Sequence, residues 1–133
     1  MNRLLLGSLL LGAGVAGSGG PRAIQGHWTG TSTCVIADWN SACNNELVVY
    51  DFVAGADSDH VLQHAAKLVN GVAEPMGDLA FSYDANAAQW NGDFHNERVR
   101  IRWSYRVKGD SLEGEVRRLP SGDVARHVVA ARH

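Results

Sequence analysis

The first residues in this sequence that point to chemistry are its two cysteines. Cys34 and Cys43 are the only cysteines in the chain. In an oxidising compartment an even count of two predicts one disulfide that closes a loop. A metal site would need further ligands at matched spacing, and the cysteines of a redox pair are more often separated by two residues. The spacing therefore favours a structural disulfide.

The histidines are the second group that could do chemistry. His60 and His64 are four residues apart, which suits a shared metal ion only on a helix, because on a strand they would lie about 13 Å apart. Haem ligation by His27, His95 or His127 is a further alternative. The chain has no Gly-x-Ser-x-Gly elbow, phosphate loop or zinc-protease helix. We predict no metal, no cofactor and no catalytic residue, which favours a non-catalytic protein.

The first residues of the chain are typical of a targeting segment and not of a folded domain. Arg3 gives the start a positive charge, and an apolar run over 4–17 is followed by small residues. This order is typical of a secretory signal peptide, and the run is shorter than the roughly 20 residues of a spanning helix. We predict a signal peptide over 1–23, one domain over 24–133, and an exported protein, periplasmic or secreted. A retained anchor is the alternative; after processing no membrane span would remain.

The composition is that of an ordinary globular chain. The 133 residues include 45% hydrophobic and 20% charged residues, with a formal net charge of -2. These values argue against disorder and give no reason to expect binding to nucleic acid.

The domain reads as a meander of eight strands. Clusters of Gly, Asn and Asp recur every 8–12 residues, between β-branched and aromatic stretches. For 60–68 a strand is expected, and a short helix capped by Asp59 is the alternative. The expected strands cover 26–36, 46–54, 60–70, 77–84, 88–95, 98–108, 111–119 and 123–132.

The strand at 98–108 has the clearest pattern. Its apolar residues alternate with arginines and a serine, a period of two. Gly109-Asp110 predicts a two-residue type II′ hairpin, which pairs Val107 with Leu112 and Trp103 with Val116. The same pairing sets Arg106 opposite a carboxylate, Glu113. The core predicted from such alternation is Trp28, Phe81, Tyr83, Trp90, Phe94, Val99, Ile101, Trp103, Tyr105 and Val116.

Eight sequential antiparallel strands with an apolar inner face predict an up-and-down barrel, because closure removes the exposed edges. The chain resembles the calycin superfamily, the lipocalins and their fatty-acid-binding relatives, in this meander, in Gly26-His27-Trp28 and in Arg132 near the end of the last strand. The resemblance implies that Trp28 packs at a closed base near a basic residue. The last strand must lie beside the first, so Trp28 and Arg132 are expected to stack.

If Trp28 closes one end, any opening lies at the other end. That end would receive the 37–45 loop with Trp39, which is either a lid held by the disulfide or simply a cover for the core. Side-chain parity turns Arg118 and Arg126 toward the same mouth. Two guanidiniums facing a cavity suit an anionic ligand, whereas rim arginines paired with Glu97, Asp123 or water are the alternative.

These patterns predict a binding module for a small apolar or amphiphilic ligand inside the barrel. The alternatives are a protein-binding or inhibitory barrel with a filled core, which implies a protein partner, and a barrel isomerase or cyclase. The predicted ligand-binding residues are Arg118, Arg126, Trp39, Trp103, Tyr105 and Phe94. The predicted structural residues are Cys34, Cys43, Trp28 and Arg132.

Overall fold

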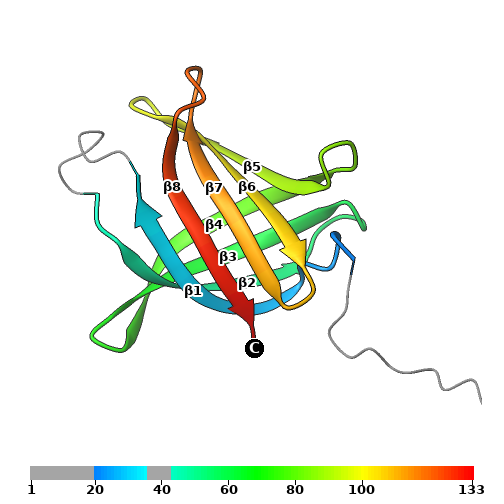
Figure 1. Cartoon of the computed structure of the whole chain (residues 1–133), viewed down its shortest axis with the longest axis horizontal. Helices are drawn as coiled ribbons and strands as arrows, with labels where there is room; N and C mark the ends of the chain where they lie inside the picture. Colours follow the sequence, from blue (N-terminus) through cyan, green and yellow to red (C-terminus); the bar gives the residue numbers. More distant parts are fainter. Residues whose placement is uncertain (1–19, 36–42) are drawn as a thin grey trace, which may run out of the picture.

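The structure, a computed structural model, describes residues 20–35 and 43–133 and arranges them as a closed antiparallel barrel (Figure 1). Each strand pairs with the next along the chain, and β8 returns to pair with β1. The all-β, eight-stranded prediction is confirmed. The strands are β1 (Gly26–Cys34), β2 (Glu46–Ala54), β3 (His60–Val69), β4 (Val72–Asp84), β5 (Gln89–His95), β6 (Arg100–Lys108), β7 (Ser111–Arg118) and β8 (Val124–Arg132).

The hairpin between β6 and β7 has the predicted register. Val107 pairs with Leu112, Arg106 with Glu113 and Trp103 with Val116. Gly109 has a φ of 60°, the positive value that the first central position of a type II′ turn requires. The register therefore places one apolar face of the hairpin inside the barrel.

Two expectations for the middle of the chain need correction. The helix considered for 60–68 is wrong, because β3 pairs with both β2 and β4 over this stretch. β4 begins at Val72 rather than at 77, so Pro75 lies within the strand and not before it. The β3–β4 register shifts between Ala65 and Ala66, and such a bulge takes up the irregular backbone around the proline.

β4 and β5 form the weakest seam of the barrel. They pair only at Ser82–Asn91, Tyr83–Trp90 and Asp84–Gln89, so the rest of β4 has no partner on β5. In Figure 1 the two strands meet at the right of the view and separate toward the left. The barrel wall is consequently less completely closed along this seam than between the other strand pairs.

Trp28 and Arg132 close one end of the barrel, called here the closed end. The guanidinium carbon of Arg132 lies 4.3 Å from the Trp28 ring centroid, which is the expected stack. Arg132 donates hydrogen bonds to the carbonyl oxygens of Ala23 and Gln25, and the indole N–H of Trp28 donates to the carbonyl oxygen of Ile24 at 2.8 Å. The segment before β1 therefore plugs the barrel, with Ile24 fully buried.

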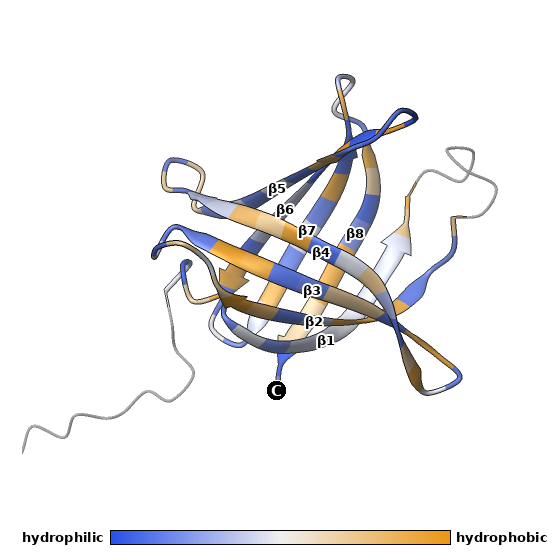
Figure 2. Ribbon diagram, turned by 180° about the vertical axis from the view of Figure 1, so that it is seen from behind, coloured by the Kyte–Doolittle hydropathy of each residue, from blue (hydrophilic) through white to orange (hydrophobic). Residues whose placement is uncertain are grey.

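The interior above this plug is filled by aromatic rings. Tyr50, Phe52, Phe81 and Tyr105 form one cluster, with ring centroids 5.2–6.3 Å apart. Gly114 is needed beside it, because a Cβ there would lie 2.3 Å from Cδ1 of Tyr105. Figure 2 shows the alternation of apolar and polar residues along the strands that builds this core.

The predicted core is correct for most residues and wrong in part, chiefly at the end opposite the plug, called here the open end. Phe94 is 42% exposed, although its parity points it inward, because β4 has already left β5 at this level. Val99 lies before β6 and is only half-buried, as are Tyr83 and Trp103. The prediction omitted the buried residues Ile24, Val48, Tyr50, Phe52, Val61, Val107, Leu112, Ala125, Val128 and Ala130.

Candidate ligand-binding site

A cavity of about 260 Å³ lies inside the open end, against the seam between β4 and β5; we call it the mouth cavity. Four of the eight strands contribute to its walls, and most of the lining side chains are apolar. The lining residues are Gln63, Ala65, Met76, Gly77, Asp78, Leu79, Phe94, Ile101 and Trp103.

The floor and the rim of the mouth cavity differ in burial. Gln63 and Ile101 are 3% and 7% exposed and form the floor. Met76 and Phe94 are exposed and form the rim beside the seam. Side chains of a regular strand alternate between faces, yet the consecutive residues 76–79 all line the cavity. The cavity therefore reaches round the edge of β4, and its opening faces the gap between β4 and β5.

A buried hydrogen-bond chain runs from the floor into the aromatic cluster. Nε2 of Gln63 donates to the hydroxyl of Tyr105 at 2.9 Å, and Tyr105 is in turn hydrogen-bonded to Tyr50. Burial raises the pKa of Tyr50 to about 12 and raises the pKa of Tyr105 well above its ordinary value. Both phenols therefore stay neutral, and neither supplies a base near neutral pH. Their hydrogen bonds fix the positions of the Tyr50 and Tyr105 rings.

The rim of the mouth cavity carries one carboxylate. Asp78 lines the cavity, and its Oδ1 accepts a hydrogen bond from Nδ1 of His64 at 2.7 Å. The neighbouring histidine His60 bonds instead to Asp57, at 2.7 Å. The two histidines that suggested a shared metal ion thus bind different aspartates.

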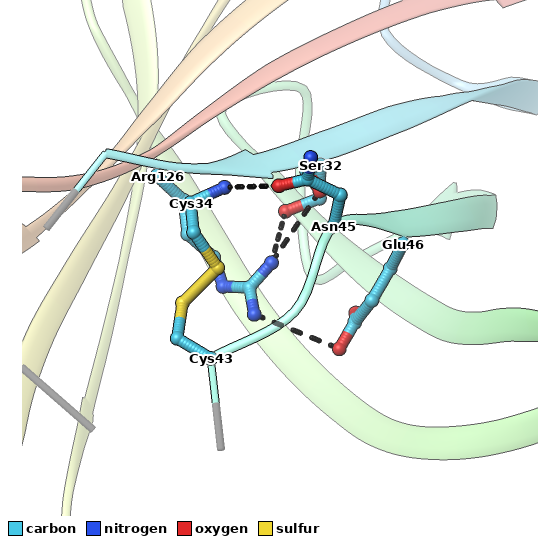
Figure 3. The surroundings of a disulfide bond; sticks show 6 residues. All are labelled: Ser32, Cys34, Cys43, Asn45, Glu46 and Arg126. Atoms are coloured by element: carbon cyan, nitrogen blue, oxygen red, sulfur yellow. Dashed lines mark hydrogen bonds and ion pairs between the residues drawn. A yellow bond between two sulfur atoms is a disulfide. The ribbon is translucent and has the colours of Figure 1, made fainter. Parts of the chain in front are cut away.

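Arg126 lies inside the open end on the other wall of the barrel (Figure 3). It donates to Oγ of Ser32 at 3.0 Å and lies 3.6 Å from the carboxylate of Glu46. The side chains of Arg126 and Glu46 are only 15% and 23% exposed. An internal carboxylate therefore balances this inward charge without a ligand, and Glu46 is a partner that parity alone did not identify.

The second predicted arginine also has a carboxylate beside it. Arg118 lies 3.6 Å from Asp123, as the alternative in the sequence analysis anticipated. It pairs across the β6–β7 ladder with Ile101, next to the mouth cavity, but neither Arg118 nor Arg126 lines that cavity. Trp103 and Phe94 do line it, and Tyr105 lies beneath it. Trp39 lies outside the described residues.

The predicted disulfide is present at the open end. Cys34 and Cys43 are bonded, with Cα atoms 6.2 Å apart, and the bond joins the end of β1 to the segment before β2 (Figure 3). Oδ1 of Asn45 accepts a hydrogen bond from the backbone N–H of Cys34 at 2.9 Å. These two links hold the start of β2, and with it Glu46, close to β1 and Arg126.

A larger depression, of about 510 Å³, lies on the outer face of β6, β7 and β8. Arg106, Glu113, Glu115, Arg117 and His127 give it charges of both signs. Arg117 is already bound to Glu115 at 2.5 Å. This depression, hereafter the outer groove, is lined mainly by polar and charged side chains, whereas the mouth cavity is lined mainly by apolar ones.

Several lining residues were missed because their position depends on pairing between strands. Gln63 and Ala65 were assigned to a strand but not to a face, although their spacing of two marks them as a pair. Asp78 and Leu79 became part of the site only through the early separation of β4 from β5. Pro75, just before the expected strand over 77–84, and Gly77 at its start were the available signals for that irregularity.

The described part of the chain contains no helix long and apolar enough to cross a membrane. Within the same residues, no group of three or more His, Cys, Asp or Glu side chains is arranged to hold a metal ion. Comparisons with protein families, with curated proteins and with solved structures find no match to this chain.

Proposed function

We propose that the protein is an exported, non-catalytic binding module that holds a small apolar or amphiphilic molecule in the mouth cavity. The observation that carries the proposal is the division of the barrel interior. The closed end is filled by Trp28 and the aromatic cluster, whereas the open end keeps about 260 Å³ of space bordered by exposed apolar side chains. Exposed apolar rims around concave sites commonly mark ligand binding.

The size of the cavity restricts the ligand. Sites for drug-sized molecules usually measure about 300–1,000 Å³, so 260 Å³ accommodates a small molecule or one end of a longer one. The calycin-like architecture supports this kind of function, because an eight-stranded barrel is just wide enough to hold one small ligand.

Export is the second element of the proposal. The Cys34–Cys43 disulfide is the kind of bond that persists in oxidising compartments. The segment before β1 also contacts the barrel, because the carbonyl oxygen of Pro21 accepts a hydrogen bond from the indole of Trp90 at 3.2 Å and Arg22 lies over the ring of Tyr83. These contacts support a mature chain that includes Pro21 and Arg22, rather than one that starts after residue 23. We therefore expect cleavage of the signal peptide before Pro21, which N-terminal sequencing of secreted protein would check.

A series of straight-chain alcohols, from butanol to decanol, tests ligand binding by calorimetric titration. Each added methylene that enters the cavity should tighten binding about fourfold, since it contributes about 0.8 kcal/mol. The gain should stop once the cavity is full. Ala65→Phe, which places a ring in the cavity, should abolish binding or stop the gain at a shorter chain. Equal binding by Ala65→Phe and wild type would contradict the proposal.

The matched control is Ala131→Phe, because Ala131 is exposed on β8, away from the mouth cavity. This variant should bind every alcohol as wild type does. Its circular dichroism and its unfolding midpoint show the effect of an added ring on the fold alone.

A protein-binding function is the second candidate, and the outer groove is the observation that favours it. Arg106 and Glu113 face each other across the β6–β7 ladder, yet no ion pair joins them in the described structure. Charges left available in this way suit a partner surface of mixed charge. Charge reversal at both positions would then abolish capture of a partner while alcohol binding in the mouth cavity stays unchanged.

A further inference from the structure

We propose that the ligand of the mouth cavity is a small hydrophobic amine, with its ammonium group beside Asp78 and its apolar body against Trp103. This inference rests on the proposed function and names the chemical class of the ligand. It differs from the anionic ligand that the parity of Arg118 and Arg126 suggested.

The charge of the lining points to a cation. Among the residues that line the mouth cavity, Asp78 is the only one with a formal charge. Its Oδ1 is bound to His64, while its Oδ2 makes no hydrogen bond within the described part of the chain. Asp78 and His64 face each other on the outer side of the β3–β4 ladder, at the edge of β4 that the cavity reaches round. Oδ2 can therefore accept a hydrogen bond from a ligand that extends over this rim.

A second and independent group in the cavity is also an acceptor. Gln63 is 3% exposed and lines the floor, and its Nε2 is turned toward the Tyr105 hydroxyl. That orientation leaves the amide oxygen of Gln63 as the acceptor on the cavity side, with no partner among the described residues. An acceptor that faces the cavity suits a ligand that brings N–H donors better than one that brings only acceptors.

The surroundings strengthen the preference for a positive charge. The stretch 72–97, which forms both sides of the open seam, contains five Asp and Glu residues and no Lys or Arg. Arg118, which pairs with Ile101 next to the cavity, lies 3.6 Å from Asp123, and Arg102 binds Asp93 through two hydrogen bonds. The ring of Trp103 offers the apolar body of the ligand a contact surface inside the cavity.

Three probes with one ring and different head groups test this inference: 2-phenylethylamine, 2-phenylethanol and phenylacetate. Titration calorimetry on the disulfide-bonded protein at low salt should give the amine an affinity about five to ten times that of the alcohol. The expected factor is modest because the Asp78 side chain is 58% exposed. Phenylacetate should bind most weakly, and added salt should reduce the advantage of the amine.

Asp78→Asn is the decisive variant. It should bring the affinity for the amine to that for the alcohol, while binding of the alcohol stays as in wild type and shows that the cavity is intact. The matched control is Glu113→Gln, which removes one carboxylate from the outer face of β7 and should leave all three affinities unchanged.

The outcomes separate this inference from the proposed function. An alcohol or a carboxylate that binds at least as tightly as the amine would overturn the inference alone, and so would an Asp78→Asn variant that keeps the full preference for the amine. Binding of phenylacetate that is lost in Arg118→Gln or Arg126→Gln would identify an anion site instead. If no probe binds, the proposed function and the inference both fail.

Discussion

The two ends of this barrel are built from the same strands and differ in how completely their inner faces are covered. At the closed end, Trp28 and Arg132 join the first strand to the last, and the segment before β1 covers the opening. At the open end, β4 separates from β5 after three residue pairs, and Phe94 faces a cavity instead of a neighbouring strand. The comparison shows that incomplete strand pairing, rather than a particular set of polar residues, leaves the cavity at the open end.

The largest expected difference between the ends is in stability. Trp28→Ala should cost about 3–5 kcal/mol of unfolding free energy, because the ring is fully buried and its neighbours are fixed by hydrogen bonds. Trp103→Ala should cost only about 1–2 kcal/mol, since the ring is partly exposed and borders a cavity. Urea unfolding of both variants measures the two values. Equal losses of unfolding free energy would contradict the claim that the closed end is filled and the open end is not.

A smaller effect is expected at the internal ion pair of the open end. Glu46→Leu should cost about 1–3 kcal/mol, because it leaves the largely buried Arg126 without its carboxylate. Arg126→Met combined with Glu46→Leu should recover most of that loss, since no charge is then left unpaired. A double-mutant cycle of unfolding free energies checks the prediction. Additive losses would show that the two side chains act independently.

The smallest effect is expected on the solvated outer face. Arg102→Ala should cost about 0.2–1 kcal/mol at neutral pH, because the pair with Asp93 is half-exposed. The hydrogen bonds from Arg102 lower the pKa of Asp93. The contribution of the pair is therefore present above the ordinary pKa of an aspartate and is lost as the pH falls through the lowered value. Unfolding midpoints measured from pH 7 to pH 2 should converge for the variant and wild type.

Local patterns predicted most of the barrel. The alternation in β6, the Gly109-Asp110 turn and the count of strands each depend on a few neighbouring residues, and the observed register agrees with them. The contact between Trp28 and Arg132 followed from closure of the meander, because only one end of β8 can lie beside the start of β1.

The site was predicted less well, because it depends on contacts between strands. The parity of Phe94 was read correctly, but its exposure depends on where β4 leaves β5, which no local pattern indicates. The inward direction of Arg126 was also read correctly. Its partner Glu46 begins a different strand, and the disulfide and Asn45 bring that residue into place.

The most direct test of the central claim is to map where a small uncharged ligand binds by two-dimensional amide NMR, with 2-phenylethanol as the probe. The account predicts saturable shifts for residues 63–65, 77–79 and 101–103, around the mouth cavity, and little change around Trp28 and Leu112 at the closed end. Shifts centred on the outer groove, or no saturable shift at any concentration the probe reaches, would contradict the claim that the open end is the ligand site.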